Sequence, residues 1–325
     1  MKLSRKDSHT KLLTHALALG LMFFMTGCAS VDPEPFSMFA NSLQPLRDAV
    51  DVQAEAVMTE SRKELIQKVA DENDPMIAPD LQLDFPAPGH FASRYGFGQN
   101  GEPNFVKFRR MQLGLSALND AMISYARSLE MLGGGAGTGD ILPSTTEFSQ
   151  MARNLNASAG TAAAALNIST DPGKQALLST AAIQLFKTYI ENKRRKDLVK
   201  AIGEVQPQVD AYSESARQAV GLFAEVVKKE YSKKIIPLSE AQPPNALAIL
   251  DFNDATQSTL AILKSMANSY GALPAAHRDL KAAANNKSAG LSGIIALGEE
   301  AMRLNGLVKQ LTEVNVAAAA ATAAQ

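Results

Sequence analysis

Three glycines near residue 100 have the spacing of a dinucleotide-binding loop. Gly96, Gly98 and Gly101 form a G-x-G-x-x-G sequence, and Asp120 follows about twenty residues later. In nucleotide-binding folds such glycines follow a strand and open a helix, and their backbone amides bind a pyrophosphate. Here a proline-containing stretch precedes the glycines and Pro103 follows them, so neither flanking element fits. We therefore predict no nucleotide site here.

The other residues that could do chemistry are sparse. His277 falls on an apolar position of a predicted helix, which indicates a hydrogen-bonded core histidine, and His90 is far from it in sequence. Two histidines without a cysteine do not supply the ligands of a transition-metal site. A catalytic triad is also hard to assemble from these residues. Asp251, Asn253 and Asp254 resemble calcium ligands, but the glycine and terminal glutamate of a calcium loop are missing. We expect no cofactor, no metal and no enzyme activity.

Cys28 is the only cysteine in the chain, and it follows an N-terminus with the layout of a secretory signal peptide. Four basic residues precede an apolar run from Leu12 to Met25. That run is too short to cross a hydrocarbon core as a helix, which takes about twenty residues. A buried N-terminal helix is the competing interpretation, but soluble folds rarely open with lysine-rich sequence that runs into LALGLMFFM.

Residues 25–28, MTGC, resemble the lipobox of bacterial lipoproteins, whose usual form is Leu-Ala/Ser-Gly/Ala-Cys. Met25 in place of leucine departs from that form. The resemblance implies that residues 1–27 are cleaved and that Cys28 is acylated on its sulfur and its new amino group. Several acyl chains on one residue hold a protein firmly in a membrane. Ala29 resembles the residue of outer-membrane-directed lipoproteins in Gram-negative cells, so we expect an outer-membrane lipid anchor and a protein that faces the periplasm.

The composition of the mature chain limits which kinds of partner and which fold class are expected. Cleavage before Cys28 leaves 28 Lys and Arg against 32 Asp and Glu, a net charge of −4. A nucleic-acid-binding protein needs a strongly basic face, so we expect no nucleic-acid partner. Tryptophan is absent and aromatic residues make up only 6% of the chain, while good helix formers abound. The composition therefore favours helices over sheets.

Apolar residues recur in steps of three and four along most of the mature chain, which is the period of a helical seam. Ser144 and Glu147 match a capping box, and Asp171-Pro172 has the form of a helix start. The predicted helices cover residues 43–70, 105–132, 144–166, 171–231, 252–280 and 294–311. We predict an all-α fold: an elongated bundle of five or six helices with coiled-coil-like heptad packing.

Prolines and end segments set the predicted boundaries. The heptad phase continues through Pro207, which favours a kinked but continuous helix over a clean break. Pro237 and Pro243-Pro244 are expected to close that helix. We expect a flexible tether over residues 28–42, with Ser42 capping the first helix. The bundle domain then spans residues 43–315, and residues 316–325 form an alanine-rich tail.

The segment from 73 to 104 is the longest part without a helical period. It contains five prolines and the aromatic residues Phe85, Phe91, Tyr95 and Phe97. Loops of this length are unusual in compact domains and often functional. Two interpretations stay open: the aromatic residues pack along the bundle as a strap, or they dock a partner.

One basic run and three classes of function remain. The basic run falls inside the predicted long helix and consists of Lys193, Arg194, Arg195 and Lys196. These residues form either a solvated face or a contact with anionic lipid head groups.

The favoured function is a structural or interaction protein of the cell envelope, a scaffold or adaptor that engages another envelope protein. The alternative is a membrane-active or lipid-binding helical protein, such as a pore former or carrier, and an enzyme is the third class.

Overall fold

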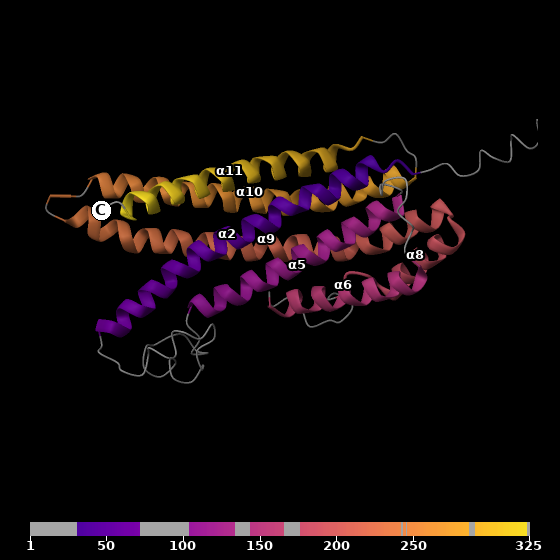
Figure 1. The fold of residues 1–325 in the computed structure, drawn as a ribbon, viewed down its shortest axis with the longest axis horizontal. Coiled ribbons are helices and arrows are strands. Elements are labelled where there is room, and N and C mark those ends of the chain that lie inside the picture. Colours follow the sequence, from indigo (N-terminus) through magenta and orange to yellow (C-terminus); the bar gives the residue numbers. More distant parts are fainter. Residues whose placement is uncertain are drawn as a thin grey trace, which may run out of the picture.

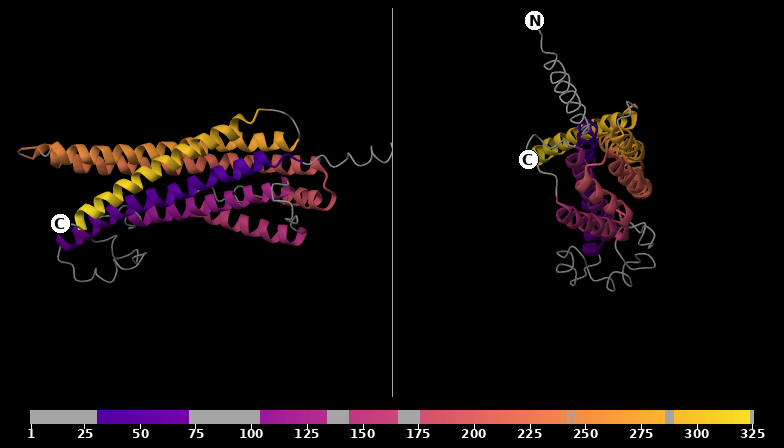
Figure 2. Two further views of the ribbon diagram at one scale, coloured as in Figure 1. Left: turned by 45° about the horizontal axis from the view of Figure 1, so that its top comes forward. Right: turned by 90° about the vertical axis from the view of Figure 1, so that its right-hand side faces the viewer.

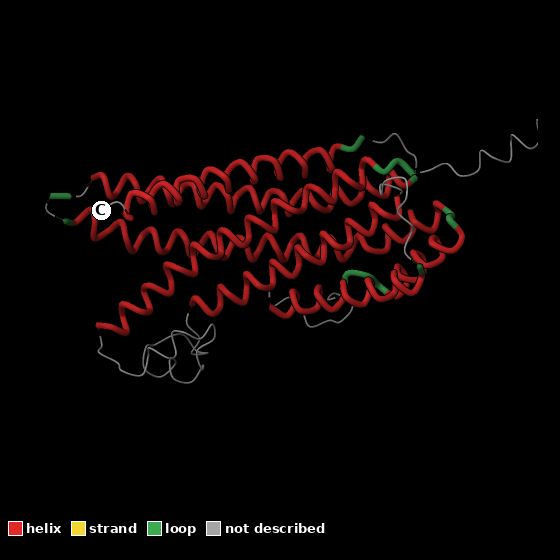
Figure 3. The backbone as a smooth tube through the Cα atoms, viewed as in Figure 1, coloured by secondary structure: helices red, strands yellow, loops and turns green. Residues whose placement is uncertain are grey.

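The fold of the described residues is all-α, as predicted. The computed structural model describes residues 31–71, 104–133, 144–165, 176–241, 243–244, 246–285 and 290–323, and within these ranges it contains seven helices and no strand (Figure 3). The helices are α2 (Glu34–Asp71), α5 (Asn104–Gly133), α6 (Thr145–Ala165), α8 (Thr180–Asn192), α9 (Arg195–Glu240), α10 (Ala246–Ala284) and α11 (Ser292–Ala323).

The long helices lie side by side in an elongated bundle (Figure 1). Helices α9 and α10 form an antiparallel hairpin, α11 packs on α10, and α2 packs between α5 and α11. The shorter helices α6 and α8 cover α5 and α9 at one end of the bundle. Helix α9 has 46 residues, which corresponds to about 70 Å at 1.5 Å per residue.

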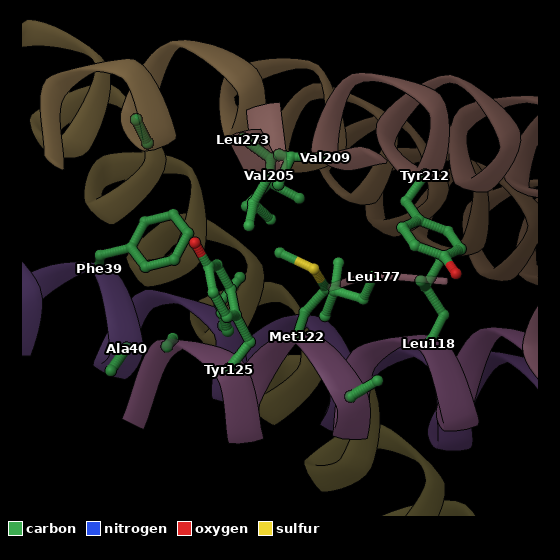
Figure 4. Packing of buried hydrophobic residues seen from close by; sticks show 14 of the residues in the cluster. Phe39, Ala40, Leu118, Met122, Tyr125, Leu177, Val205, Val209, Tyr212 and Leu273 are labelled. Atoms are coloured by element: carbon green, nitrogen blue, oxygen red, sulfur yellow. The ribbon is translucent and has the colours of Figure 1, made fainter. Parts of the chain in front are cut away.

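The apolar positions predicted from the helical period form one continuous core. Tyr125, Met122 and Leu118 of α5 face Val205, Val209 and Tyr212 of α9 in the centre of the bundle (Figure 4). Buried positions on the other long helices include Leu263, Met266, Tyr270, Leu273 and Leu280 of α10 and Ile294, Leu297, Ala301 and Leu304 of α11. Burial of this continuous apolar stripe is the main source of stability for helices of this length.

The predicted tether is wrong for residues 34–42, because helix α2 begins at Glu34. The Asp32 carboxylate accepts a hydrogen bond from the Glu34 amide at 3.1 Å and so caps the helix. Pro35 lies in the first turn, where a helix needs no amide donor. Ser42 does not cap a helix: its hydroxyl donates to the Met38 carbonyl at 2.7 Å inside α2.

The predicted helix over 171–231 is interrupted, which raises the helix number above the predicted five or six. Residues 176–179 are not helical, and α8 starts after Ser179, whose hydroxyl accepts from the Ala182 amide at 3.1 Å. Helix α8 ends at Asn192, and α9 starts at Arg195. The basic run at 193–196 therefore spans the turn between two helices: Lys193 and Arg194 connect them, and Arg195 and Lys196 are the first residues of α9.

The predicted effects of proline are partly confirmed. Helix α9 continues through Pro207, so the continuous-helix interpretation is correct and the clean break is not. Pro237 does not end the helix, which runs on to Glu240. At the C-terminus, α11 extends to Ala323, because alanine is the best helix former and the predicted tail largely continues the helix.

Two helix starts have clear local causes. The capping box at α6 is confirmed: the Glu147 carboxylate accepts from the Ser144 amide at 2.7 Å, and the Ser144 hydroxyl accepts from the Glu147 amide at 3.2 Å. At α11 the Asp279 carboxylate accepts from the Gly293 amide at 2.6 Å. A β-carbon on Gly293 would lie 2.6 Å from the Ala275 carbonyl carbon, so α11 crosses α10 closely at this glycine.

Candidate functional site

Most of the functional residues predicted from the sequence lie outside the described residues. This holds for Cys28, for the aromatic residues Phe85, Phe91, Tyr95 and Phe97, for the glycine motif at 96–101 and for His90. Their roles stay predictions. The described candidates are the basic run at 193–196, the core histidine His277 and the acidic residues of α5 and α10.

The basic run forms a tight turn whose geometry differs from a helix face. Lys193 has φ 51° and ψ 30°, a left-handed conformation, and its amide donates to the Tyr189 carbonyl at 2.7 Å to close α8. Arg194 is extended and pairs with Asp197 of the first turn of α9 at 3.1 Å. Lys193, Arg194 and Lys196 are exposed, while Arg195 is partly buried. Several cationic groups are thus gathered on one short turn.

The basic turn lies at the end of the bundle where α2 begins (Figures 1 and 2). Val31, the first described residue, is buried, and it lies only three residues after Cys28 in the sequence. The closed end of the α9–α10 hairpin lies at the opposite end of the bundle. The basic turn therefore lies at the end of the bundle where the described chain starts, three residues after Cys28 in the sequence.

Replacing Lys193 by glycine is expected to stabilise the protein by about 0.5–1 kcal/mol. A side chain in the left-handed region is strained, whereas glycine adopts this conformation without a steric cost. Urea denaturation monitored by circular dichroism measures the change. Lys200→Gly is the matched control, because Lys200 is an exposed lysine within helix α9, where glycine costs about 1 kcal/mol. A loss of stability in both variants would contradict the strain at Lys193.

His277 is a buried, fully hydrogen-bonded histidine, as predicted. Its Nε2 lies 2.8 Å from the Tyr125 hydroxyl, and its Nδ1 lies 2.8 Å from Oε1 of Gln206. The Gln206 amide nitrogen donates to Asp210, which fixes Oε1 as the atom facing the ring. Because a carbonyl oxygen only accepts, Nδ1 carries the proton and Nε2 accepts from Tyr125. Burial, with smaller contributions from Arg278 and Lys281, lowers the pKa of His277 to about 3.

A second polar contact lies six or seven residues away along the same helices. The Tyr270 hydroxyl of α10 donates to Oδ1 of Asn119 on α5 at 2.9 Å, and the Ser213 hydroxyl of α9 donates to the Tyr270 carbonyl at 2.6 Å. Burial raises the pKa of Tyr270. Together with the His277 contacts, these two polar layers join α5, α9 and α10 in one register, because a shift would leave buried polar groups unpaired.

The acidic candidates have structural contacts. Asp120 borders a groove of about 410 Å³ between α5 and α6, and it pairs with Arg47 of α2 at 2.9 Å. Glu147, in the same groove, is the capping residue of α6, and the Ser144 hydrogen bonds lower its pKa. Asp251 and Asp254 lie within helix α10 and not on a loop. In the described part of the chain, no cluster of three or more metal-binding side chains is present.

One exposed feature was missed in the sequence interpretation: the closed end of the α9–α10 hairpin. The side chains of Ile236, Leu247 and Leu250 are among the most exposed large apolar groups of the described residues. The signal was present in the sequence, because the apolar stretch ALAIL at 246–250 comes one residue after Pro243-Pro244. Its exposure depends on how far the neighbouring helices extend, which the local sequence does not reveal.

Comparison with protein-family models, curated protein sequences and solved structures found no match to this chain. Among the helices that the structure describes, none combines the length and apolar character of a membrane span.

Proposed function

We propose that this chain is a bacterial lipoprotein, anchored in the outer membrane through acylated Cys28, which acts in the periplasm as a scaffold or adaptor of the cell envelope. The observation that carries the proposal is the difference between the two ends of the bundle, because the described chain starts at one of them. The described chain starts at Val31, three residues after Cys28, at one end of an elongated bundle (Figure 1). An anchor at that position would hold this end near the membrane and present the opposite end to partners.

The basic turn adds a second argument for the same orientation. The turn, residues 193–196, is at the end where α2 begins, and three of its four cationic side chains are exposed. Basic groups close to an anionic surface contribute about 1 kcal/mol each to membrane attraction. Head-group contact by the turn would therefore assist the acyl chains and orient the bundle relative to the membrane.

Replacing Cys28 by alanine is expected to move the protein from the membrane fraction to the soluble fraction. The acyl chains supply the proposed attachment, since the described helices contain no span. Immunoblots of membranes washed with high salt measure the distribution, and metabolic labelling with a fatty acid measures acylation. A mutant that stays in the washed membrane pellet would refute the anchor.

The lipid-binding alternative is tested on the basic turn. Replacing Lys193, Arg194 and Lys196 by glutamine should leave acylation and the membrane fraction unchanged if the protein is a scaffold. Vesicle flotation with anionic and with neutral lipids measures direct lipid binding. If the turn variant no longer floats with anionic vesicles although Cys28 is acylated, lipid binding by the helical bundle becomes the favoured function.

A further inference from the structure

The closed end of the α9–α10 hairpin lies apart from the other described helices. Figure 2 shows α2 and α11 diverging from the hairpin toward this end. Among the described side chains between Phe223 and Thr256, none is buried. The outermost part of this end, residues 235–241, 243–244 and 246–250, is called the apolar cap below.

The apolar cap is largely exposed, although its sequence is typical of a buried segment. Glu240 is the only charged residue from 235 to 250. The apolar pair 235–236 and the apolar run 246–250 consist of consecutive residues, which point to different sides of a helix because each is turned by about 100°. A helix that is apolar all round is normally buried. The cap therefore has apolar surface on several sides that no described part of the chain covers.

Three side chains show how much of this surface is open to solvent. Leu247 is 75% exposed, Leu250 is 55% exposed and Ile236 is 52% exposed. They belong to both helices of the hairpin, since Ile236 lies on α9 and the two leucines lie on α10. The exposed apolar surface therefore surrounds the closed end and is not confined to one face.

Charged residues begin at nearly the same level on the two helices. Tyr231 of α9 and Phe252 of α10 lie level, because their rings stack with centroids 5.6 Å apart and planes 5° apart. The charged residues that flank the cap in the sequence are Lys234 and Asp251. The Lys234 ammonium lies 5.5 Å from the centroid of the Phe252 ring, next to Asp251 in the sequence. The boundary between charged and apolar residues therefore crosses both helices within about one turn.

We propose that the apolar cap inserts into the surface of a lipid bilayer, with the closed end of the hairpin pointing into the membrane. A bilayer has a flat boundary between its head groups and its acyl chains, and the charge boundary crosses the hairpin at one level in the same way. From residue 235 to residue 240, helix α9 rises by about 9 Å. This length matches the about 5–10 Å to which interfacial helices bury their apolar side chains in a membrane.

The residues behind the cap fit the head-group region. Residues 228–234 of α9 and the level part of α10, residues 251–255, together contain four lysines and three acidic residues, a net charge of +1. Lysine side chains bury their apolar stems and place their ammonium groups among phosphates. A second copy of this chain would cover only one side of the hairpin, whereas a bilayer surrounds an inserted end on every side. The lipid surface is therefore the occupant that fits the cap.

The contact does not depend on acylation of Cys28. The apolar cap lies at the end of the bundle opposite to the start of α2 (Figure 1). In a chain that is also anchored through Cys28, the two ends of the bundle would attach to two separate lipid surfaces. Only this last step rests on the proposed function.

Fluorescent labelling of the mature chain tests the insertion. Residues 28–325 with Cys28→Ser contain every described residue, cannot be acylated and have no thiol. An environment-sensitive dye is attached to Leu247→Cys, and Met302→Cys is the matched control, since Met302 is 71% exposed on α11 and lies off the cap. With vesicles of phosphatidylcholine and about one quarter phosphatidylglycerol, the emission at 247 should shift to the blue and the emission at 302 should not.

Two outcomes of this labelling would overturn the proposal. One is an emission at 247 that vesicles leave unchanged or shift no more than the emission at 302. The other is a blue shift at 247 that needs no vesicles and grows with protein concentration, because a second copy of the chain would then cover the cap. Since the chain carries no acyl group, neither outcome depends on whether the proposed anchor exists.

Substitutions in the same unacylated chain test which residues bind the vesicles. Leu247→Gln combined with Leu250→Gln should weaken flotation with vesicles by at least about tenfold, since two apolar side chains no longer leave water favourably. Met302→Gln should leave flotation unchanged, and circular dichroism confirms that the variants are folded. Glu240→Gln removes the one charge of the cap that must leave water and should strengthen binding by about threefold or more.

Salt separates the apolar cap from the basic turn at 193–196. Binding through basic side chains is screened by salt, whereas burial of apolar surface is not. Flotation of the wild-type sequence with Cys28→Ser should therefore persist in high salt. Flotation that is lost in high salt, or that is equal in the double leucine variant and Met302→Gln, would overturn the proposal.

Discussion

Replacing Phe39 by alanine is expected to lower the free energy of unfolding by about 3–5 kcal/mol, the usual cost of removing a buried aromatic side chain. The Phe39 side chain has no exposed surface, and its ring centroid lies 6.3 Å from that of His277 on α10. The neighbouring aromatic residue Phe36 is buried to the same extent. The first turns of α2 thus close the core at the end of the bundle where this helix begins.

Urea denaturation monitored at 222 nm measures this effect, and Glu34→Ala is the control from the same helix. Glu34 is exposed in the first turn, so its replacement should cost less than about 1 kcal/mol, the contribution of an acid near a helix N-terminus. If Phe39→Ala and Glu34→Ala had equal effects, the segment at 34–42 would behave as the tether predicted from the sequence and not as a packed helix.

The apolar period predicted the helices well where it was long and uninterrupted. Helix α5 was expected over 105–132 and covers Asn104–Gly133. Tyr125, Tyr212 and Tyr270 lie on the apolar side of their helices, and all three are among the largest fully buried side chains. A repeat of three and four residues needs no knowledge of the neighbouring helices, because it records only which side of one helix is buried.

The predicted helix boundaries were wrong where one residue type can have two structural roles. Pro35 lies in the segment that was predicted to be a tether, although proline is also suited to the first turn of a helix. At Lys193 a lysine adopts the left-handed conformation that glycine normally supplies, so no sequence signal marked the turn. The exposure of apolar side chains at the closed end of the α9–α10 hairpin depends on the relative lengths of the neighbouring helices, which no local pattern contains.

The polar layers were predictable only in part. The seam position of His277 indicated a buried histidine, but its partners Tyr125 and Gln206 lie on two other helices and are far away in sequence. Contacts of this kind follow from the register between helices. The register is in turn set by the packing of the whole core.

Acidification is expected to destabilise the protein through His277, and a variant without this imidazole should lose part of that pH dependence. Burial is the largest cause of the lowered pKa, about 3, and Arg278 and Lys281 lower it further. The unfolded chain has an ordinary histidine with a pKa near 6.5. The groups that face the ring from other helices are Tyr125, Gln206 and Phe39, and none carries charge at neutral pH.

The sign follows from the number of protons bound in each state. Between pH 6.5 and 3 the unfolded chain binds a proton on His277 and the folded chain does not, so stability falls as the pH falls. The contribution is fully present above pH 6.5 and lost by about pH 3. Its slope approaches about 1.4 kcal/mol per pH unit in the middle of this window, which gives about 2–3 kcal/mol between pH 6.5 and 4.5.

Comparison with His277→Gln isolates this contribution from that of the carboxylates, which titrate in both proteins. Glutamine does not titrate and can hydrogen-bond to Tyr125. At pH 7.5 the variant should be less stable than the wild type because the fit of the ring is lost. As the pH is lowered to 4.5, the stability gap should shrink by about 2–3 kcal/mol, because only the wild type must keep a histidine unprotonated to fold. Urea denaturation at a series of pH values measures both curves, and parallel curves would show that His277 has the same pKa in the folded core as in the unfolded chain.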